Sequence, residues 1–386
     1  MPAKIPATVV TGFLGAGKTT LIRHVLSEAQ GRRIALIINE FGDLGVDGDI
    51  LKGCGDETCR EDEIVELSNG CICCTVADDF IPTMEALLAR DTPPDHIVIE
   101  TSGLALPQPL VRAFNWPGIS TKVTVDGVIT VVDGKAVTEG RFAHDTAAVD
   151  AQRAADAGLD HETPLSELFE DQVACADMIV VNKADLLGPD AAAELTAHLK
   201  GSSRQGVQVL AATKGALPVG ILLGMGVGAE ADLAARHEVH HHHHHDEEDA
   251  HPNDRGHDNG HGHDNGHDQD HGHGNGHAHG HDNGHAHGHD AFESFTVELG
   301  EIADPATYAA QVADVIRAHD ILRLKGFLAV EGKPMRLTLQ AVGPRIETYF
   351  DQPLSDRRSR LVVIGQAGLD RAAITAALAV PAPVTA

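Results

Sequence analysis

A glycine-rich segment near the N-terminus has the residue types and spacing of a phosphate-binding loop. Gly12-Phe13-Leu14-Gly15-Ala16-Gly17-Lys18-Thr19 fits the pattern G-x4-G-K-[S/T], between an apolar run and a helical pattern. Glycines let backbone N–H groups turn inward around phosphates, and the start of a helix adds positive potential. Lys18 would reach the β- and γ-phosphates, and Thr19 would ligate Mg²⁺. We predict that nucleotide phosphates are bound by Gly12, Gly15, Ala16, Gly17, Lys18, Thr19 and Thr20.

An acidic residue at the end of a second apolar run could hold the magnesium ion. Ile97–Ile99 predicts a buried strand, Glu100 follows it directly, and Gly103 comes three residues later. An acid after a strand is often only a solvated loop residue, but this one follows the phosphate-binding loop in the order found in nucleotide hydrolases. We expect Glu100 to hold Mg²⁺ through water and Gly103 to sense the γ-phosphate. Lys18, Glu100 and Gly103 are therefore the predicted catalytic residues.

A short polar motif after a further apolar run could select the base. Asn182, Lys183 and Asp185 form N-K-x-D after Met178–Val181. The Asp185 carboxylate can accept hydrogen bonds from guanine N1–H and the N2 amino group, whereas adenine has no donor at these positions. The motif thus favours GTP over ATP, with Asn182 and Lys183 supporting the base and its loop. The segment Ala212–Lys214 either closes over the base or is an unrelated turn.

Three cysteines within four residues, Cys71, Cys73 and Cys74, have the composition of a metal site. Soft thiolates select Zn, Co or Cu over Mg or Ca. A tetrahedral site needs a fourth ligand, and Glu40 is the candidate because it stands where the first switch segment of a GTPase would be. The alternative is a set of buried or redox-active cysteines.

The other cysteines and two lone histidines carry weaker signals. Cys54 and Cys59 lie in an acidic stretch; they either bind or relay metal, or they are exposed loop cysteines. Cys175 stands alone in an apolar segment and is interpreted as structural. His24 and His319 are interpreted as surface or core residues rather than ligands.

The composition changes abruptly near residue 237. Of the 26 histidines, 20 lie in His237–His289, mixed with Gly, Asp and Asn. This segment has almost no large apolar side chain with which to build a core, so we predict a disordered, metal-binding insertion. The predicted division is a GTPase domain with the C-x-C-C site at 1–235, the insertion at 236–290, and a C-terminal domain at 291–386.

Apolar runs alternate with helical patterns before the insertion, which predicts an α/β fold: a P-loop GTPase domain with a mostly parallel sheet covered on both faces. A small α+β domain follows the insertion. The expected strands are Ala7–Val10, Ile34–Ile38, Ile64–Leu67, Ile97–Ile99, Val128–Val132, Met178–Val181, Val207–Leu210, Phe295–Leu299, Ile321–Val330, Met335–Ala341 and Leu361–Ile364. The expected helices are Lys18–Gln30, Asp78–Arg90 with Asp78 or Asp79 as its cap, Pro305–His319, and a segment from Arg371.

The formal net charge of −28 argues against a nucleic-acid partner, because neutralising phosphates needs Lys and Arg. It fits attraction of metal cations, or simply solubility. Met1–Pro6 lacks the apolar region of a signal peptide, and no run reaches the roughly 18 apolar residues of a membrane span. The sequence therefore predicts a cytoplasmic protein with no membrane partner, and it does not specify an oligomeric state.

Together these motifs resemble the CobW family of P-loop GTPases, in the branch that includes the urease and hydrogenase nickel chaperones. The matching segments, in order, are TGFLGAGKTT, NEFGDLGVDG, SNGCICC, IETSGLALP and VNKAD. Phe292–Ile364, with LRLKGF at Leu322–Phe327, resembles the family's C-terminal domain. KGCGDETC and VADDF resemble most the members linked to cobalt insertion in aerobic cobalamin synthesis. Ala212–Lys214 departs from the usual guanine-contacting loop.

The resemblance implies a GTP-hydrolysing metallochaperone with GTP, Mg²⁺ and Co²⁺ or Zn²⁺ as its ligands. It would bind cobalt at the C-x-C-C site in the Mg-GTP state, release it after hydrolysis and supply a cobaltochelatase. One alternative is a zinc-handling chaperone of the same family. Others are a largely non-catalytic histidine-rich metal store, and a GTPase scaffold that metal only regulates.

Overall fold

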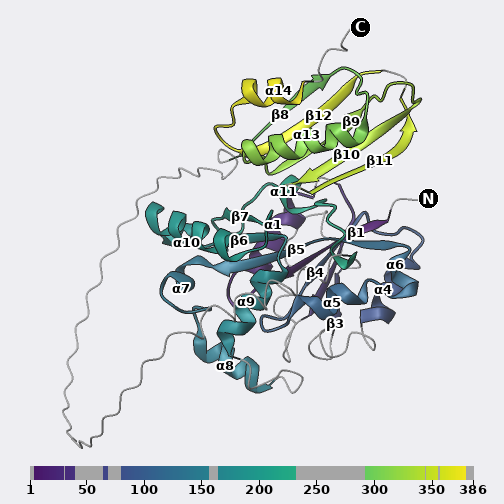
Figure 1. Cartoon of the computed structure of the whole chain (residues 1–386). Helices are drawn as coiled ribbons and strands as arrows, with labels where there is room; N and C mark the ends of the chain where they lie inside the picture. The colour runs from purple at the N-terminus through teal and green to yellow at the C-terminus, as the bar shows by residue number, and fades with distance from the viewer. Residues whose placement is uncertain are drawn as a thin grey trace, which may run out of the picture.

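The computed structural model describes residues 4–29, 31–39, 64–67, 80–155, 164–231, 292–343, 345–354 and 357–379. They form an N-terminal α/β domain and a C-terminal α+β domain, each built on one sheet (Figure 1). None of the helices in these ranges is long and apolar enough to cross a membrane.

The N-terminal sheet has seven strands in the order β3-β2-β4-β1-β5-β6-β7, and every pairing in it is parallel. This confirms the predicted parallel α/β architecture. The strands are β1 (Ile5–Thr11), β2 (Ile34–Asn39), β3 (Ile64–Leu67), β4 (His96–Glu100), β5 (Val123–Asp133), β6 (Met178–Asn182) and β7 (Gln208–Ala211). Their carboxyl ends share one edge of the sheet, where the loops that carry the predicted motifs begin.

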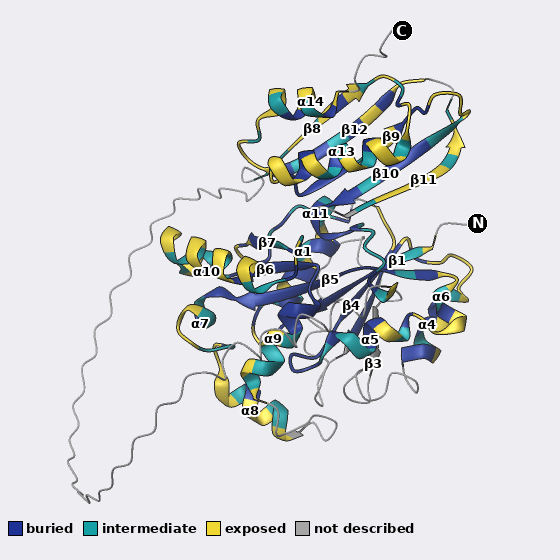
Figure 2. Ribbon diagram, viewed as in Figure 1, coloured by how far each residue is buried: buried dark blue, intermediate teal, exposed yellow. Residues whose placement is uncertain are grey.

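Helices cover both faces of this sheet, and their outward sides are exposed (Figure 2). They are α1 (Lys18–Ser27), α4 (Ile81–Leu88), α5 (Pro107–Ala113), α6 (Pro117–Ser120), α7 (Gly134–Thr138), α8 (Thr146–Ala155), α9 (Leu165–Cys175), α10 (Pro189–Ser202) and α11 (Val219–Leu222), with short 3-10 turns η3 (Ala184–Leu186) and η4 (Ala229–Ala231).

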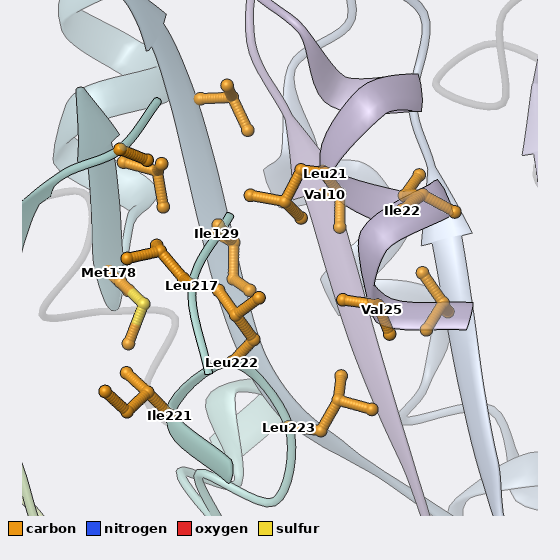
Figure 3. Close-up of a cluster of buried hydrophobic side chains, with 14 of the residues drawn as sticks. Val10, Leu21, Ile22, Val25, Ile129, Met178, Leu217, Ile221, Leu222 and Leu223 are labelled. Atoms are coloured by element: carbon orange, nitrogen blue, oxygen red, sulfur yellow. The ribbon is translucent and has the colours of Figure 1, made fainter. Parts of the chain in front are cut away.

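Alternate residues of the central strands belong to two different cores, because successive side chains in a strand point to opposite faces. Val10 and Val98 join the core that contains Leu21, Ile22 and Val25 of α1 (Figure 3). Their neighbours along the strands, such as Val9 and Ile97, join the core with residues of α4 and α5. The first of these cores fixes α1, and therefore the loop before it, against the sheet.

The C-terminal domain is a five-stranded antiparallel sheet in the order β11-β10-β9-β12-β8. Two helices pack on it through one apolar core that includes Val312, Leu324 and Ile374. Its elements are β8 (Phe292–Leu299), α13 (Pro305–Ala318), β9 (Arg323–Leu328), β10 (Met335–Val342), β11 (Arg345–Pro353), β12 (Ser359–Gln366) and α14 (Arg371–Leu378). The predicted α+β class of this domain is confirmed.

Arg323 of β9 connects the two domains. Its guanidinium donates hydrogen bonds to backbone carbonyls in and after α11, those of Gly220, Leu223 and Gly224. The same segment is held from the other side, because Asp126 of β5 accepts from the N–H of Gly224 at 2.6 Å and of Gly226 at 2.7 Å. Leu322 and Val342 complete the junction by joining the core that surrounds α1.

Several element boundaries differ from the sequence prediction. The first helix ends at Ser27 rather than Gln30. The helix predicted at Asp78–Arg90 is described as α4 from Ile81 to Leu88, with Phe80 as its N-cap and Pro82 in its first turn, where a missing N–H costs nothing. The predicted capping residues Asp78 and Asp79 lie outside the described residues. The strand β11 was not expected. It lies at the edge of the sheet, and charged residues such as Glu347 interrupt the apolar pattern by which a strand is recognised in the sequence.

Candidate nucleotide-binding site

The predicted phosphate-binding loop runs from the end of β1 to the start of α1 and takes backbone conformations that only glycine adopts easily. Gly12, Gly15 and Gly17 have φ of 132°, 73° and 102°. A Cβ on Gly12 would lie 2.1 Å from the Val131 carbonyl oxygen, whereas nothing lies within 4 Å of a Cβ on Gly15. The loop is therefore packed tightly at its start and open at its middle, which suits a cradle for phosphate oxygens.

Lys18, the first residue of α1, turns back over this loop. Its side chain is only 7% exposed, and Nζ donates to the Gly12 carbonyl at 2.8 Å and to the Phe13 carbonyl at 3.4 Å. The ammonium group thus lies inside the turn that would surround the phosphates.

Thr19 and Glu100 come together from different elements. The Thr19 hydroxyl donates to Glu100 Oε1 at 3.2 Å, and Glu100, at the carboxyl end of β4, is 4% exposed. A hydroxyl and a carboxylate are hard oxygen ligands of the kind Mg²⁺ prefers beside nucleotide phosphates. These two residues therefore fit a magnesium ion bound at the phosphates.

The loop after Glu100 lies directly against the phosphate-binding loop. Thr101 donates through its hydroxyl to the Thr11 hydroxyl at 2.9 Å and through its N–H to the Val10 carbonyl at 3.0 Å. A Cβ on Gly103 would lie 2.7 Å from the backbone nitrogen of Leu14. Only glycine permits this approach, which brings the predicted γ-phosphate contact to the cradle.

Asn182 connects the predicted base motif to the phosphate-binding loop. Its Nδ2 donates to the Ala16 carbonyl at 2.9 Å, and its Oδ1 accepts from the N–H of Gly215 at 2.9 Å. A Cβ on Gly17 would lie 2.1 Å from that Nδ2, so the glycine makes room for the asparagine. Gly215 directly follows Ala212–Lys214, and the structure therefore brings this loop to the base motif despite its loose sequence match.

Lys183 and Asp185 follow Asn182 in the predicted base motif. Lys183 has a left-handed backbone with φ of 59°, and its Nζ lies 2.6 Å from Asp133 Oδ2. Asp133, at the end of β5, is 1% exposed and also caps α7 by accepting from Ala136 N–H. Asp185 is exposed and free to meet a base. The sequence analysis missed Asp133, although an acid directly after the run Val128–Val132 is the same signal that singled out Glu100.

Comparison with known proteins identifies the chain. Residues 6–210 match the nucleotide-binding domain of the CobW/HypB/UreG family, and residues 292–380 match the C-terminal domain of the cobalamin synthesis protein cobW. This chain belongs to the CobW/HypB/UreG family. The CobW resemblance drawn from the motifs is thereby confirmed.

Its relatives in this family include two bacterial proteins described as "Zinc chaperone CobW". The one from Sinorhizobium sp. is 53% identical over 97% of this chain and 96% of its own length. The one from Pseudomonas aeruginosa is 48% identical over 96% of this chain and 90% of its own length. The "Zinc chaperone YjiA" of Escherichia coli is 28% identical over 94% of each chain.

The predicted transition-metal ligands of this CobW-family chain, Glu40, Cys71, Cys73 and Cys74, lie outside the described residues, as do Cys54 and Cys59. Within the described ranges, no three His, Cys, Asp or Glu side chains are grouped so as to hold a metal ion. Cys175 is buried in the core beside β5, in line with a structural role. His24 is half-buried and contacts the Leu217 carbonyl at 2.9 Å.

Proposed function

We propose that this chain is a GTPase metallochaperone that binds a divalent transition metal in its Mg-GTP state and releases it to a receiving protein after hydrolysis. The observation that carries the proposal is the convergence of Lys18, Thr19 and Glu100 at one end of the site, together with the contact of Asn182 with the phosphate-binding loop at the other. The GTPase activity and a metallochaperone role follow from membership of the CobW/HypB/UreG family.

Each residue of the nucleotide site has a task in this proposal. Lys18 would neutralise the β- and γ-phosphate oxygens, and Gly103 would donate its N–H to the γ-phosphate. Thr19 and Glu100 would hold Mg²⁺, which would supply positive charge to neutralise the nucleotide phosphates. In hydrolysis a water oxygen bonds to the γ-phosphorus, the bond to the bridging oxygen breaks, GDP leaves, and the water proton passes to the released phosphate.

The metal cargo is proposed to bind Cys71, Cys73 and Cys74, with Glu40 as the fourth ligand. Zinc is the favoured cargo, since two relatives that are 53% and 48% identical to this chain are described as zinc chaperones. Zinc also generally exceeds cobalt in affinity for the same ligands. Cobalt, with a cobaltochelatase as the receiving protein, is the alternative outcome of the test. The division at 1–235, 236–290 and 291–386 and a cytoplasmic location belong to this proposal.

The test is a competition of Zn²⁺ against Co²⁺ for the full chain with Mg-GTP, with Mg-GDP and without nucleotide. One tight metal site should form only with Mg-GTP, because the γ-phosphate orders the segments that carry the ligands. Linkage requires that the metal in turn tighten GTP binding relative to GDP. Equal metal affinity in all three states would refute the coupling.

Lys18→Ala is the matched variant for this experiment. It should abolish hydrolysis and also weaken metal binding in the presence of Mg-GTP, while metal bound without nucleotide stays as in the wild type. Loss of hydrolysis with unchanged metal binding would leave a GTPase whose nucleotide cycle does not control the metal.

A further inference from the structure

Two glutamines hold the loop after Glu100 from two sides. Gln172 of α9, fully buried, donates through Nε2 to the Gly103 carbonyl and to the Ala105 carbonyl, both at 3.1 Å. Gln152 of α8, half-buried, donates through Nε2 to the Ser102 hydroxyl at 3.1 Å. No motif in the sequence pointed to either residue.

The helices that carry these glutamines also pack on the phosphate-binding loop. Phe13 shares a buried cluster with Leu104 and with Val149, which lies one turn before Gln152 on α8. Its ring centroid lies 6.2 Å from that of Phe169 on α9. One apolar cluster therefore joins α8, α9, the phosphate-binding loop and the loop after Glu100. A shift of α8 would consequently displace side chains that pack on both loops.

The position of Ser102 and Gly103 matters because this loop must meet the γ-phosphate. Gly103 already lies against Leu14, where a Cβ would come within 2.7 Å of the backbone nitrogen. A misplacement of about 1 Å at a reacting centre can cost about 10²-fold in rate. Gln172 fixes the carbonyl side of Gly103, and Gln152 fixes the residue just before it.

We propose that Gln152 is a positioning residue for GTP hydrolysis, acting through the Ser102 hydroxyl to set Gly103 against the γ-phosphate. This inference rests on the proposed GTPase function. It predicts that Gln152 influences the steps that depend on the γ-phosphate and leaves the binding of GDP unchanged, because GDP lacks the γ-phosphate that Gly103 would meet.

The experiment uses the full chain with Mg²⁺ and Zn²⁺ and compares Gln152→Ala with Gln108→Ala. Gln108 of α5 is a suitable control, since it is also half-buried but donates its hydrogen bond to the Asp171 carbonyl, at 3.4 Å, rather than to Ser102. For Gln152→Ala we expect kcat to fall about 10- to 100-fold, with Kd for GDP and the unfolding midpoint close to the wild type. Gln108→Ala should keep the wild-type kcat.

A double-mutant cycle with Ser102→Ala separates positioning from packing. If Gln152 acts through the hydroxyl, the loss of kcat in the double variant should be close to that of either single variant, because both remove the same hydrogen bond. Additive losses, an unchanged kcat in Gln152→Ala, or equal weakening of GTP and GDP would overturn the proposal. Its failure is distinct from failure of the proposed function, in which the wild-type chain itself would not hydrolyse GTP.

Discussion

Asn182 and Ala16, 166 residues apart in the sequence, are joined by a buried hydrogen bond of 2.9 Å that ties the base end of the nucleotide site to its phosphate end. The same carboxamide accepts from Gly215, so one side chain fixes three loops. The spacing between base and phosphate recognition therefore depends on this residue.

Replacing Asn182 with Ala should weaken GTP and GDP alike. It leaves the Ala16 carbonyl and the Gly215 N–H without their partner, which costs stability of about 1–3 kcal/mol for each group. Because the two loops are then no longer held in place, we expect Kd to rise roughly 10- to 100-fold, equivalent to about 1.4–2.8 kcal/mol. Titration calorimetry with GDP measures the loss. Asn115→Ala is the control, because Asn115 donates to the Glu230 carbonyl at an exposed site. Wild-type affinity in Asn182→Ala would contradict the role of this link.

The variant Asp185→Asn should lose the preference for guanine and prefer xanthine instead. Asp185 is exposed at the mouth of the base loop. An amide in its place can donate to the 2-oxo group of xanthine, where guanine instead presents an amino donor. Competition of GTP with xanthosine triphosphate measures the change, and an unaltered preference for GTP would show that Asp185 does not contact the base.

The phosphate loop, the acid after β4 and the base motif could be predicted from the sequence, because each is a short pattern in which neighbouring residues act together. Gln152 and Gln172 could not be predicted as easily, since their partners lie 50 to 69 residues away and only the fold brings them close. Likewise the parallel sheet could be predicted from uniformly apolar runs, whereas the half-exposed edge strand β11 could not.

Acid should destabilise the N-terminal domain through His96. This buried residue at the start of β4 lies 2.8 Å from the Thr8 hydroxyl. Burial lowers the pKa of His96 below its usual 6.5. The nearby Asp126 carboxylate acts to raise the pKa, whereas the positive charges of Arg32 and Arg323 lower it further. The unfolded chain then binds the proton more readily, so the stabilisation is present above about pH 6.5 and is lost as pH falls below it.

The substitution His96→Gln should flatten this pH dependence, because glutamine can still bond Thr8 but does not become charged. Urea unfolding at several pH values between about 7.5 and 5 gives the free energy of unfolding for both proteins. If the two slopes against pH are identical, protonation of His96 does not contribute.

Deleting His237–His289 should leave GTP binding and the tight, GTP-dependent metal site intact and remove most low-affinity metal capacity. Imidazoles with a pKa near ~6.5 are mostly neutral ligands at neutral pH and release metal as pH approaches about 5. A Gly/Ser segment of equal length is the control for the connection itself. Loss of the tight site in that control, or unchanged total capacity, would refute the reservoir role.

The contacts of Arg323, Leu322 and Val342 with the N-terminal domain have a consequence for how this protein can evolve. Because side chains at the junction set the placement of the two domains, the 60 residues between Ala231 and Phe292 need not do so. The length of that segment can therefore change in evolution without altering how the two domains pack against each other.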